Sequence, residues 1–464
     1  MQDKFGQLQK IIVKLMRKFK VPGLAISILQ NDKSVYEKGF GFRNLEESLS
    51  MTPDSLIGIG SISKSFTALL ILKLEEKGLL NLEDSISKFL EIEPFISHPN
   101  ITIAHLLSHS SGIPSVDAQW LPIAITYGDY QRIYPLGSID DYLYHLSETK
   151  DEIFFKPGEK FFYNNDMFTL LGMIIEKLTG KSFEDVLREE ILTPLEMNRA
   201  TVRREKLEKD PVKDFITGYI HKGTEEKLQF DKPKLPFSDY LQAPGGLYTS
   251  MHEMLNYAKC LLNKGVYKEK QIIKPESLEL LWTPRIKSPY GYGKDPKYCL
   301  GWVREEDFLN TTLIHHGGGL GVSTSFFGIL PNLNIAVSVA ENDDSGICSI
   351  IGLSALTLML GKDPEKNVEK LKIFEIYDKI TGNYKSSLGL YKLEVTFKAF
   401  SIHIKVETDD GTFDFPLIIE DFDDLTFKLF STVPSNLQKV KFYQDSMTRK
   451  VIYATYDRYL YHKV

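Results

Sequence analysis

The sequence predicts a two-part chain: an α/β (α+β) domain with one central antiparallel sheet and a helical region, then a small all-β C-terminal barrel. Three observations predict it. Strand patterns lie at both ends of residues 10–345 with helical patterns between them, a polar break follows at 361–367, and later residues alternate between apolar and polar. A length of 464 residues also favours more than one unit. We place the domains at 1–365 and 375–464.

The N-terminal segment combines an amphipathic helix with a β-hairpin. To about Lys20, apolar residues recur at helical spacing with basic residues between them, which indicates a packed helix and not a secretory signal. Strand patterns at 24–29 and 34–41 flank the turn-forming residues 30–33. No run of about 18 apolar residues occurs, so we expect no membrane span and a cytoplasmic protein.

The middle of the chain is mainly helical, and the C-terminal part is all β. Hydrophobic spacing predicts helices at 64–76, 102–109, 165–179, 183–190 and 251–263. Paired strands are expected at 324–330 and 335–340. Beyond them, alternating residues include Phe400, Ile402, Ile404 and Val406, and Asp409-Asp410-Gly411 predicts a hairpin turn. Further strands are expected at 413–419, 425–430, 438–443 and 450–461.

Composition excludes several classes of protein. Hydrophobic residues make up 42% and charged residues 25%, and the net charge is −6 with a pI near 6.0. A nucleic-acid or membrane-surface binder would need a basic face, so we expect neither partner. Cys260, Cys299 and Cys348 are too few and too irregularly spaced for a disulfide framework or a metal site, so we expect reduced core thiols and no cofactor. Frequent Lys and Glu indicate a thermophilic source.

The stretch most informative about chemistry is Ser61-Ile62-Ser63-Lys64, where a glycine-containing turn leads into the first of the predicted central helices. At a spacing of three, Ser61 and Lys64 lie on one helix face. A serine hydroxyl is a poor nucleophile until a base removes its proton, and a nearby amine is a candidate base. Free N–H groups of the first turn can bind an oxyanion. The alternative is an N-cap serine followed by a solvated lysine.

Two further motifs offer complementary groups. Tyr163-Asn164-Asn165 holds a phenol and an amide two residues apart, and a phenolate near a cation can take the proton from Ser61; alternatively, Asn165 is only the cap of the helix after it. In His315-His316-Gly317-Gly318-Gly319, a glycine run allows close approach of a substrate, and a histidine can hold a carboxylate or transfer a proton. A flexible turn is the alternative there.

In this order, the three motifs resemble those of the serine β-lactamase and penicillin-binding-protein superfamily. The branch they resemble contains AmpC-type β-lactamases, D-alanyl-D-alanine carboxypeptidases and D-aminopeptidases. Ser61 precedes Tyr163 by 102 residues, and Tyr163 precedes His316 by 153. The resemblance covers about residues 10–345. Other segments similar to the family are Leu106–Gly112, Leu171–Glu176, Pro194–Met197 and Pro244–Ser250.

The resemblance implies a β-lactamase-like fold and a role for each matching residue. The catalytic residues that it implies are Ser61, Lys64, Tyr163, Asn165 and His316. Ser61 is then the acylated nucleophile, Lys64 and Tyr163 are proton acceptors, and Asn165 orients the substrate amide or Lys64. The backbone N–H groups of Ser61 and Gly319 form the oxyanion hole. The histidine replaces the lysine of K-T-G, which disfavours strong recognition of a β-lactam carboxylate.

The C-terminal unit lies outside that resemblance. A serine peptidase of this superfamily with an appended lipocalin-like domain, known from archaea, has the same layout. That comparison implies a peptide substrate, a preference for D-residues beside the scissile bond, and a closed homo-oligomer of high order. We expect the barrel to serve assembly or to restrict access, and the alternative is a carrier of lipids or small molecules.

Other patterns do not support a different enzyme class. Gly180-Lys181-Ser182 lacks the upstream glycine of a P-loop, and no G-x-S-x-G elbow occurs. His105 and His109 stand four residues apart without H-E-x-x-H, so we expect structural roles for both. Four aromatic residues in an insertion either roof the substrate or pack on the surface. They are Trp120, Tyr127, Tyr130 and Tyr134.

The sequence therefore predicts a serine hydrolase that cleaves peptides through an acyl-enzyme on Ser61, without a metal. Within the superfamily, an esterase or a β-lactamase is the alternative. A non-catalytic binding or sensor protein that keeps the fold is the alternative from another class. Whether Lys64 or Tyr163 removes the first proton is open at this point.

Overall fold

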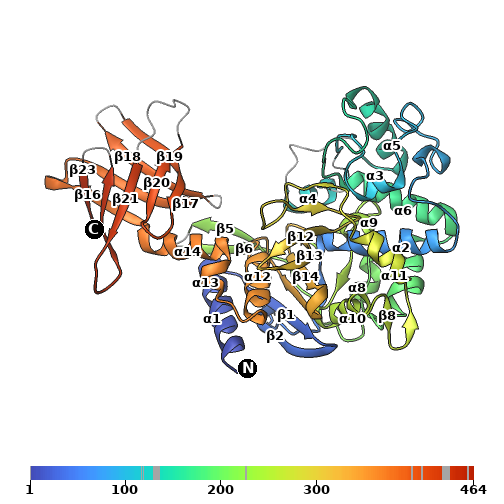
Figure 1. Cartoon of the computed structure of the whole chain (residues 1–464), viewed down its shortest axis with the longest axis horizontal. Coiled ribbons are helices and arrows are strands. Elements are labelled where there is room, and N and C mark those ends of the chain that lie inside the picture. Colours follow the sequence, from blue (N-terminus) through green and yellow to red (C-terminus); the bar gives the residue numbers. More distant parts are fainter. Residues whose placement is uncertain are drawn as a thin grey trace. The chain divides into compact units, whose positions relative to one another are not determined.

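The chain folds into two compact units, Met1–Lys362 and Asp363–Val464, in the computed structural model (Figure 1). The residues described are 2–116, 118, 120–128, 136–224, 227–398, 401–408, 411–430, 439–456 and 459–464. Each unit has its own hydrophobic core. The first unit contains all the motifs singled out above as chemical.

A nine-stranded sheet forms the centre of the first unit, with the order β10-β11-β12-β13-β14-β15-β1-β2-β3. Every neighbouring pair in that order is antiparallel. The N-terminal hairpin pairs with β15, so strands from both ends of the unit meet in one sheet, as predicted. The strands are β1 (Gly23–Gln30), β2 (Lys33–Asn44), β3 (Leu49–Ser50), β10 (Ile286–Lys287), β11 (Lys297–Tyr298), β12 (Val303–Phe308), β13 (Thr311–Gly319), β14 (Thr324–Leu330) and β15 (Ile335–Glu341).

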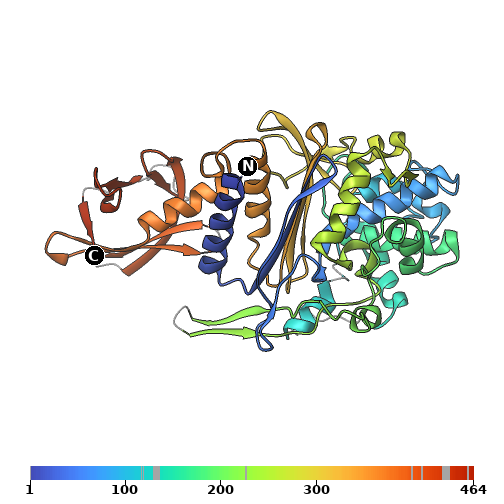
Figure 2. The ribbon, with the colours of Figure 1, turned by 90° about the horizontal axis from the view of Figure 1, so that it is seen from below.

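Helices cover both faces of this sheet. The helices α1 (Gln2–Phe19) and α12 (Cys348–Met359) lie on one face, and α10 (Met251–Leu262) lies on the other, next to the helical region (Figure 2). The other helices of the unit are α2 (Ser63–Glu76), α3 (Ile103–Leu107), α4 (Trp120–Tyr127), α5 (Ile139–Ser147), α6 (Asn165–Thr179), α7 (Phe183–Leu187), α8 (Arg204–Glu208), α9 (Gln242–Gly245) and α11 (Pro275–Leu281). The short strands are β4 (Ile57–Gly58), β5 (Ile220–Thr224), β6 (Lys227–Asp231), β7 (Tyr248–Thr249), β8 (Val266–Tyr267) and β9 (Lys270–Gln271).

The helix α2 is the central element of the helical region. All its residues from Ser63 to Leu72 are buried, polar ones included, which is typical of a helix enclosed by others rather than packed on one face. A short 3₁₀ turn, η1 (Gly60–Ile62), precedes it and links it to β4. The predicted helix 64–76 is thus confirmed, and its buried position forces Lys64 into the interior.

The second unit is a closed antiparallel barrel with two short helices before it. Ile402, Ile404 and Val406 point inward and are buried, as the alternation predicted, whereas Phe400 and Asp409-Asp410 lie outside the described residues. The segment predicted as one strand at 450–461 contains two. The elements are α13 (Pro364–Asn367), α14 (Glu369–Ile380), β16 (Gly382–Ser386), β17 (Lys392–Lys398), β18 (Ser401–Thr408), β19 (Gly411–Asp421), β20 (Thr426–Leu429), β21 (Lys439–Gln444), β22 (Val451–Tyr456) and β23 (Tyr459–Lys463).

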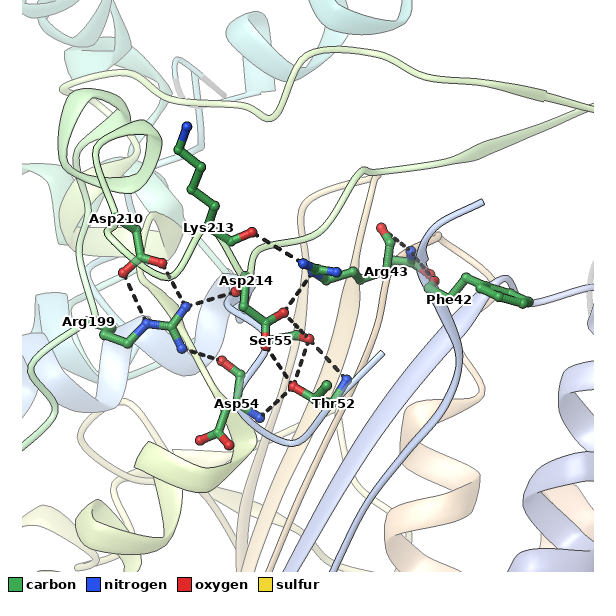
Figure 3. A network of polar contacts seen from close by, with 10 residues as sticks. Phe42, Arg43, Thr52, Asp54, Ser55, Arg199, Asp210, Lys213 and Asp214 are labelled. Carbon is green, nitrogen blue, oxygen red and sulfur yellow. Dashed lines mark hydrogen bonds and ion pairs between the residues drawn. The ribbon is translucent and has the colours of Figure 1, made fainter. Parts of the chain in front are cut away.

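A polar network holds the segment that leads into β4 and η1 (Figure 3). The Asp214 carboxylate accepts hydrogen bonds from Thr52 Oγ1 at 2.8 Å and Ser55 Oγ at 2.6 Å, and it pairs with Arg43 Nε at 2.8 Å. Leu56, which follows Ser55 in the chain, donates its N–H to the backbone oxygen of Asp214 at 2.8 Å. Asp214 therefore ties the approach to Ser61 to β2.

Arg199 extends this network from the other side. Its guanidinium binds both carboxylate oxygens of Asp210, at 3.0 and 2.8 Å. The remaining N–H groups donate to the backbone oxygens of Asp54 and Asp214, at 2.7 and 3.0 Å (Figure 3). Such a planar fork of donors can satisfy one carboxylate and two carbonyl groups at once, which a lysine could not do.

We expect Asp214→Ala to lower the free energy of unfolding of the first unit by about 2–3 kcal/mol, because Arg43 and two hydroxyl groups lose their shared acceptor. Tryptophan fluorescence in a urea titration would report it, since all three tryptophans lie in the first unit. Glu189→Ala, which removes the exposed ion pair with Lys181, is the matched control and should leave the midpoint unchanged. Equal shifts in both variants would contradict this role of Asp214.

Candidate active site

Ser61 lies where the 3₁₀ turn η1 meets strand β13, and glycines make that contact possible. Gly60 has φ +53°, and a Cβ there would come within 2.3 Å of the Gly319 nitrogen. A Cβ on Gly318 would come within 1.9 Å of the Ile59 oxygen. Only glycine fits at both positions, so the glycine run brings the Gly319 backbone next to Ser61. The Ser61 side chain remains partly exposed and accessible.

Among the described strands, β13 has a partner on one side only at the end that lies beside Ser61. The pairing of β12 with β13 ends at His315 opposite Val303, whereas β14 continues to pair as far as Gly319. From His316 to Gly319, β14 is therefore the one described strand that pairs with β13. The turn η1 lies against this end of β13. Backbone N–H groups of Ser61 and Gly319, the expected oxyanion hole, come from these two adjacent elements.

Lys64 is fully buried, and its amine has three polar neighbours. Nζ donates to Asn165 Oδ1 at 2.5 Å and to the Pro244 carbonyl oxygen at 2.8 Å, and it lies 3.0 Å from Ser61 Oγ. None of these three groups carries a negative charge. Burial lowers the pKa of Lys64 well below its usual 10.5. A neutral amine whose two N–H groups are occupied keeps its lone pair for the Ser61 hydroxyl proton.

The two asparagines of the second motif have different roles. Asn164 is the N-cap of α6, because its Oδ1 accepts from the Asp166 N–H at 2.9 Å. Asn165 is the first residue of the helix, and its side chain binds Lys64. The alternative that Asn165 is only a cap is therefore wrong. The cap on Asn164 frees the next side chain to point at the lysine.

Tyr163 lies directly beside Ser61 and Lys64. Burial raises the pKa of Tyr163 above its usual 10, and the hydrogen bond with Ser61 opposes that shift only in part. Its ring centroid lies 4.8 Å from Lys64 Nζ and 4.2 Å from the centroid of the His109 ring. The phenol is consequently protonated near neutral pH and can donate or relay a proton, but it is not a standing phenolate.

His316 faces the same site and is uncharged. Burial lowers the pKa of His316 to about 3, and the nearby Lys64 acts in the same direction. Its Nδ1–H donates to the Gly317 oxygen at 2.5 Å, which leaves Nε2 to accept from the Tyr298 hydroxyl at 3.0 Å. His316 therefore offers a substrate a neutral imidazole and not a positive charge.

Sequence reasoning missed three residues that contact this group. The Pro244 carbonyl oxygen, which accepts from Lys64, belongs to the segment Pro244–Ser250. The similarity of that segment to the family was the sequence signal that could have placed it near the site. Tyr298 binds His316 but stands in a short strand with no recognisable motif. The ring of Tyr290 contacts that of Tyr163 edge-on, with centroids 5.5 Å apart. Neither tyrosine could be distinguished from the many others in the sequence.

The residues set aside in the sequence have structural contacts. His105 Nδ1 accepts from the Thr102 N–H in a capping box at the start of α3. His109 accepts from the Asn164 N–H at 3.1 Å and supports the Tyr163 loop. Of the insertion aromatics, Tyr130 and Tyr134 lie outside the described residues, and the side chains of Trp120 and Tyr127 are not described either.

Further observations concern metals, thiols and membranes. Cys260, Cys299 and Cys348 are buried, free thiols, as expected for core residues. Within the described ranges, no group of three or more His, Cys, Asp or Glu side chains could hold a metal ion. Among the helices that the structure describes, none is both long and apolar enough to cross a bilayer. The cytoplasmic location stays a prediction.

The sequence pattern of the β-lactamase family matches residues 8–347. The chain belongs to this family. Members of its superfamily are serine hydrolases, and the expected resemblance and fold are thereby confirmed, with the closed eight-stranded barrel as a second unit. This member retains the central sheet and helical region, with Ser61 at their junction.

Curated relatives of the chain include two bacterial proteins. Penicillin-binding protein 4* of Bacillus subtilis is 25% identical over 397 residues, which cover 82% of this chain and 83% of that protein. The protein Flp of Staphylococcus aureus is 29% identical over 350 residues, which cover 74% of this chain. The aligned region spans 64% of Flp, slightly less than two thirds of its length.

Solved structures similar to the chain include one that matches both units. The octameric penicillin-binding protein homologue from Pyrococcus abyssi is 34% identical, with a TM-score of 0.90 over 99% of this chain and 100% of that chain. A D-stereospecific amidohydrolase from Streptomyces shares the fold at 21% identity, with a TM-score of 0.57 over 73% of this chain and 93% of that chain.

We expect the rate at which a fluorophosphonate labels Ser61 to rise with pH through the pKa of Lys64 and to level off well below pH 10.5. Below that pKa the amine is protonated and cannot accept the serine proton. Labelling rates measured by intact-protein mass spectrometry at a series of pH values would locate the pH at which the rate rises, which is the acid limb of the profile.

His316→Asn is the control for this pH dependence. Because His316 is uncharged above about pH 3, its replacement should leave the acid limb at the same pH even if the rate falls. A limb near pH 6.5 that disappears in His316→Asn would show that the histidine, and not Lys64, controls the reaction.

Proposed function

We propose that this protein is a serine peptidase that cleaves peptide bonds through an acyl-enzyme on Ser61, with a preference for D-residues beside the scissile bond. The proposal rests on one observation above all: a buried amine, whose polar partners among the described residues are all uncharged, lies 3.0 Å from a partly exposed serine hydroxyl. This is the arrangement that makes serine nucleophilic. It agrees with the membership of the chain in a family of serine hydrolases.

In the proposed acylation, Lys64 takes the proton as Ser61 Oγ attacks the carbonyl carbon of the substrate. The developing oxyanion accepts hydrogen bonds from the N–H groups of Ser61 and Gly319. The proton then passes from Lys64, through the hydroxyl of Tyr163, to the leaving nitrogen as its bond to carbon breaks. A water molecule releases the acyl group by the same route in reverse. Asn165 holds Lys64 in position throughout.

Lys64 is a better first base than Tyr163 in this scheme. Burial disfavours charge on both groups, but the consequences are opposite. A lysine that loses its charge becomes a base, whereas a tyrosine that stays neutral keeps its proton. We therefore assign the first proton transfer to Lys64 and the relay to Tyr163.

Two considerations favour a peptide over a β-lactam. The neutral His316 supplies no positive charge for a β-lactam carboxylate. A D-stereospecific amidohydrolase and SurE, whose structure is known with D-Leu, also share the fold, which supports amides with D-residues as substrates. An ester would be attacked by the same groups, so only comparative rates can separate the two activities.

We expect a fluorophosphonate to form one covalent adduct, on Ser61, and Ser61→Ala to lose both the adduct and turnover while the fold is retained. Values of kcat/KM for matched D- and L-peptides, a p-nitrophenyl ester and a cephalosporin should be highest for a D-peptide. A higher value for the ester or the cephalosporin would support an esterase or a β-lactamase instead. No adduct and no turnover would favour a binding protein.

We further propose that the chain forms a closed homo-oligomer through its barrel. The Pyrococcus homologue that is similar over both units is octameric. In the segment between β16 and β17, Leu388 and Leu390 are 94% and 73% exposed, so the barrel unit presents apolar side chains to water there. A contact with other copies would remove these side chains from water.

Light scattering of the full-length chain should therefore give a mass several times that of one subunit. Deletion of residues 371–464 should reduce the mass, while fluorophosphonate labelling of Ser61 reports that the first unit is folded. An unchanged assembly in the shortened chain would contradict this role for the barrel.

A further inference from the structure

The loop at residues 288–296 connects β10 to β11 and carries two tyrosines to different places. Tyr290 reaches the active site, where its ring lies edge-on to those of Tyr163 and Phe161, with centroids 5.5 and 5.8 Å away. Its side chain is nevertheless 53% exposed. A large ring thus lies beside Tyr163 with much of its surface free to contact another molecule.

Tyr292, two residues further on, is partly buried and packs against β13 and β14. Its ring centroid lies 5.0 Å from that of His315 and 6.3 Å from that of Phe326. Phe326 in turn contacts Gly352 of α12 closely, so this is the α12 side of the sheet. Because neighbouring side chains of a strand point to opposite faces, His315 faces α12 while His316 faces the active site. The loop therefore places Tyr290 on the active-site face of the sheet and Tyr292 on the face covered by α12.

A buried carboxylate fixes the loop in this position. Glu305 Oε1 accepts from the Tyr292 N–H at 2.8 Å and lies 2.8 Å from His315 Nε2. Both side chains of this pair are almost fully buried, with 1% and 4% exposed. A hydrogen bond to a buried carboxylate is among the stronger ones in proteins. The contact anchors the backbone two residues from Tyr290.

Two glycines allow the loop to pack closely against Pro296 and Glu305. A Cβ on Gly291 would come within 2.4 Å of Pro296 Cβ, and one on Gly293 would come within 2.7 Å of Glu305 Oε2. On the other side of Tyr290, Ser288 is buried, and its hydroxyl binds both the nitrogen and the oxygen of Tyr290, at 3.0 and 2.9 Å. Tyr290 is thus held from both directions, although its ring is half exposed.

We propose that Tyr290, with Phe161, forms the wall of a subsite for an aromatic or large aliphatic side chain next to the scissile bond of the substrate. The inference rests on the proposed peptidase function and names the class of side chain that the site selects. Contact with such a side chain would remove apolar ring surface from water on both partners. A small side chain would leave that surface exposed.

Glu305, His315 and Tyr292 act in this proposal as positioning residues. They lie on the far side of the sheet from the reacting atoms and influence selectivity only through the placement of Tyr290. This gives a function to the first histidine of the His-His-Gly-Gly-Gly motif, which the catalytic scheme does not use.

Two peptides that differ only in Phe or Ala beside the scissile bond, each in D- and L-form, test the inference. The wild-type protein should favour the Phe substrate at least about tenfold in kcat/KM, a ratio that an apolar subsite can supply. Tyr290→Ala should reduce this ratio to near one, mainly through a higher KM for the Phe substrate. Tyr290→Phe should retain most of it.

Two more variants complete the design. Glu305→Ala should lower the same ratio although Glu305 lies away from the site, because the Tyr292 N–H loses its acceptor. Tyr144→Ala, which removes an exposed tyrosine of α5, should leave the ratio unchanged. Fluorophosphonate labelling of Ser61 in every variant reports whether the nucleophile remains reactive.

The outcomes separate this inference from the function on which it rests. If the wild-type protein forms no Ser61 adduct and turns over no peptide, the proposed function fails and the subsite with it. If it turns over peptides without a preference for Phe, or if Tyr290→Ala slows both substrates equally, the proposed function stands and the subsite is refuted.

Discussion

The burial of one amine sets the conditions for everything else in this site. Lys64 lies in the first turn of a helix that is enclosed on all sides, and no carboxylate is among its three polar contacts. Keeping an ammonium ion there would cost several kcal/mol of lost hydration, so the group gives up its proton instead. The same desolvation keeps Tyr163 protonated and His316 uncharged. Burial thus disfavours charge on Lys64, Tyr163 and His316 alike, which is the condition that the proposed base and proton relay require.

Close contacts hold the backbone around these side chains in a narrowly defined conformation. Gly60 and Gly318 allow η1 and β13 to approach more closely than any side chain would permit. Asn164 caps α6 so that Asn165 can reach the lysine. The Asp214 network fixes the segment before β4 (Figure 3). These contacts come from different parts of the chain, and together they place Lys64 within hydrogen-bond distance of Ser61 and Asn165.

Much of the fold could be predicted from the sequence because its signals are local. The helix at 165–179 and the strand at 324–330 have the predicted ends, since apolar periodicity specifies them directly. Short elements such as α11 and β10 were missed, because two to seven residues carry too little periodic signal. In the barrel, alternation revealed the inward positions but not that 450–461 forms two strands.

The sequence alone determined which reactive groups are present and in what order, and that order was enough to indicate the family. Tertiary structure decided their protonation states, because a pKa depends on neighbours and burial contributed by distant segments. It also decided that Asn164 and not Asn165 is the cap, and that Tyr290 lies against Tyr163 while Tyr292 is anchored on the opposite face. The sequence does not distinguish the two tyrosines of this loop. Their roles differ because the structure places them on opposite faces of the sheet.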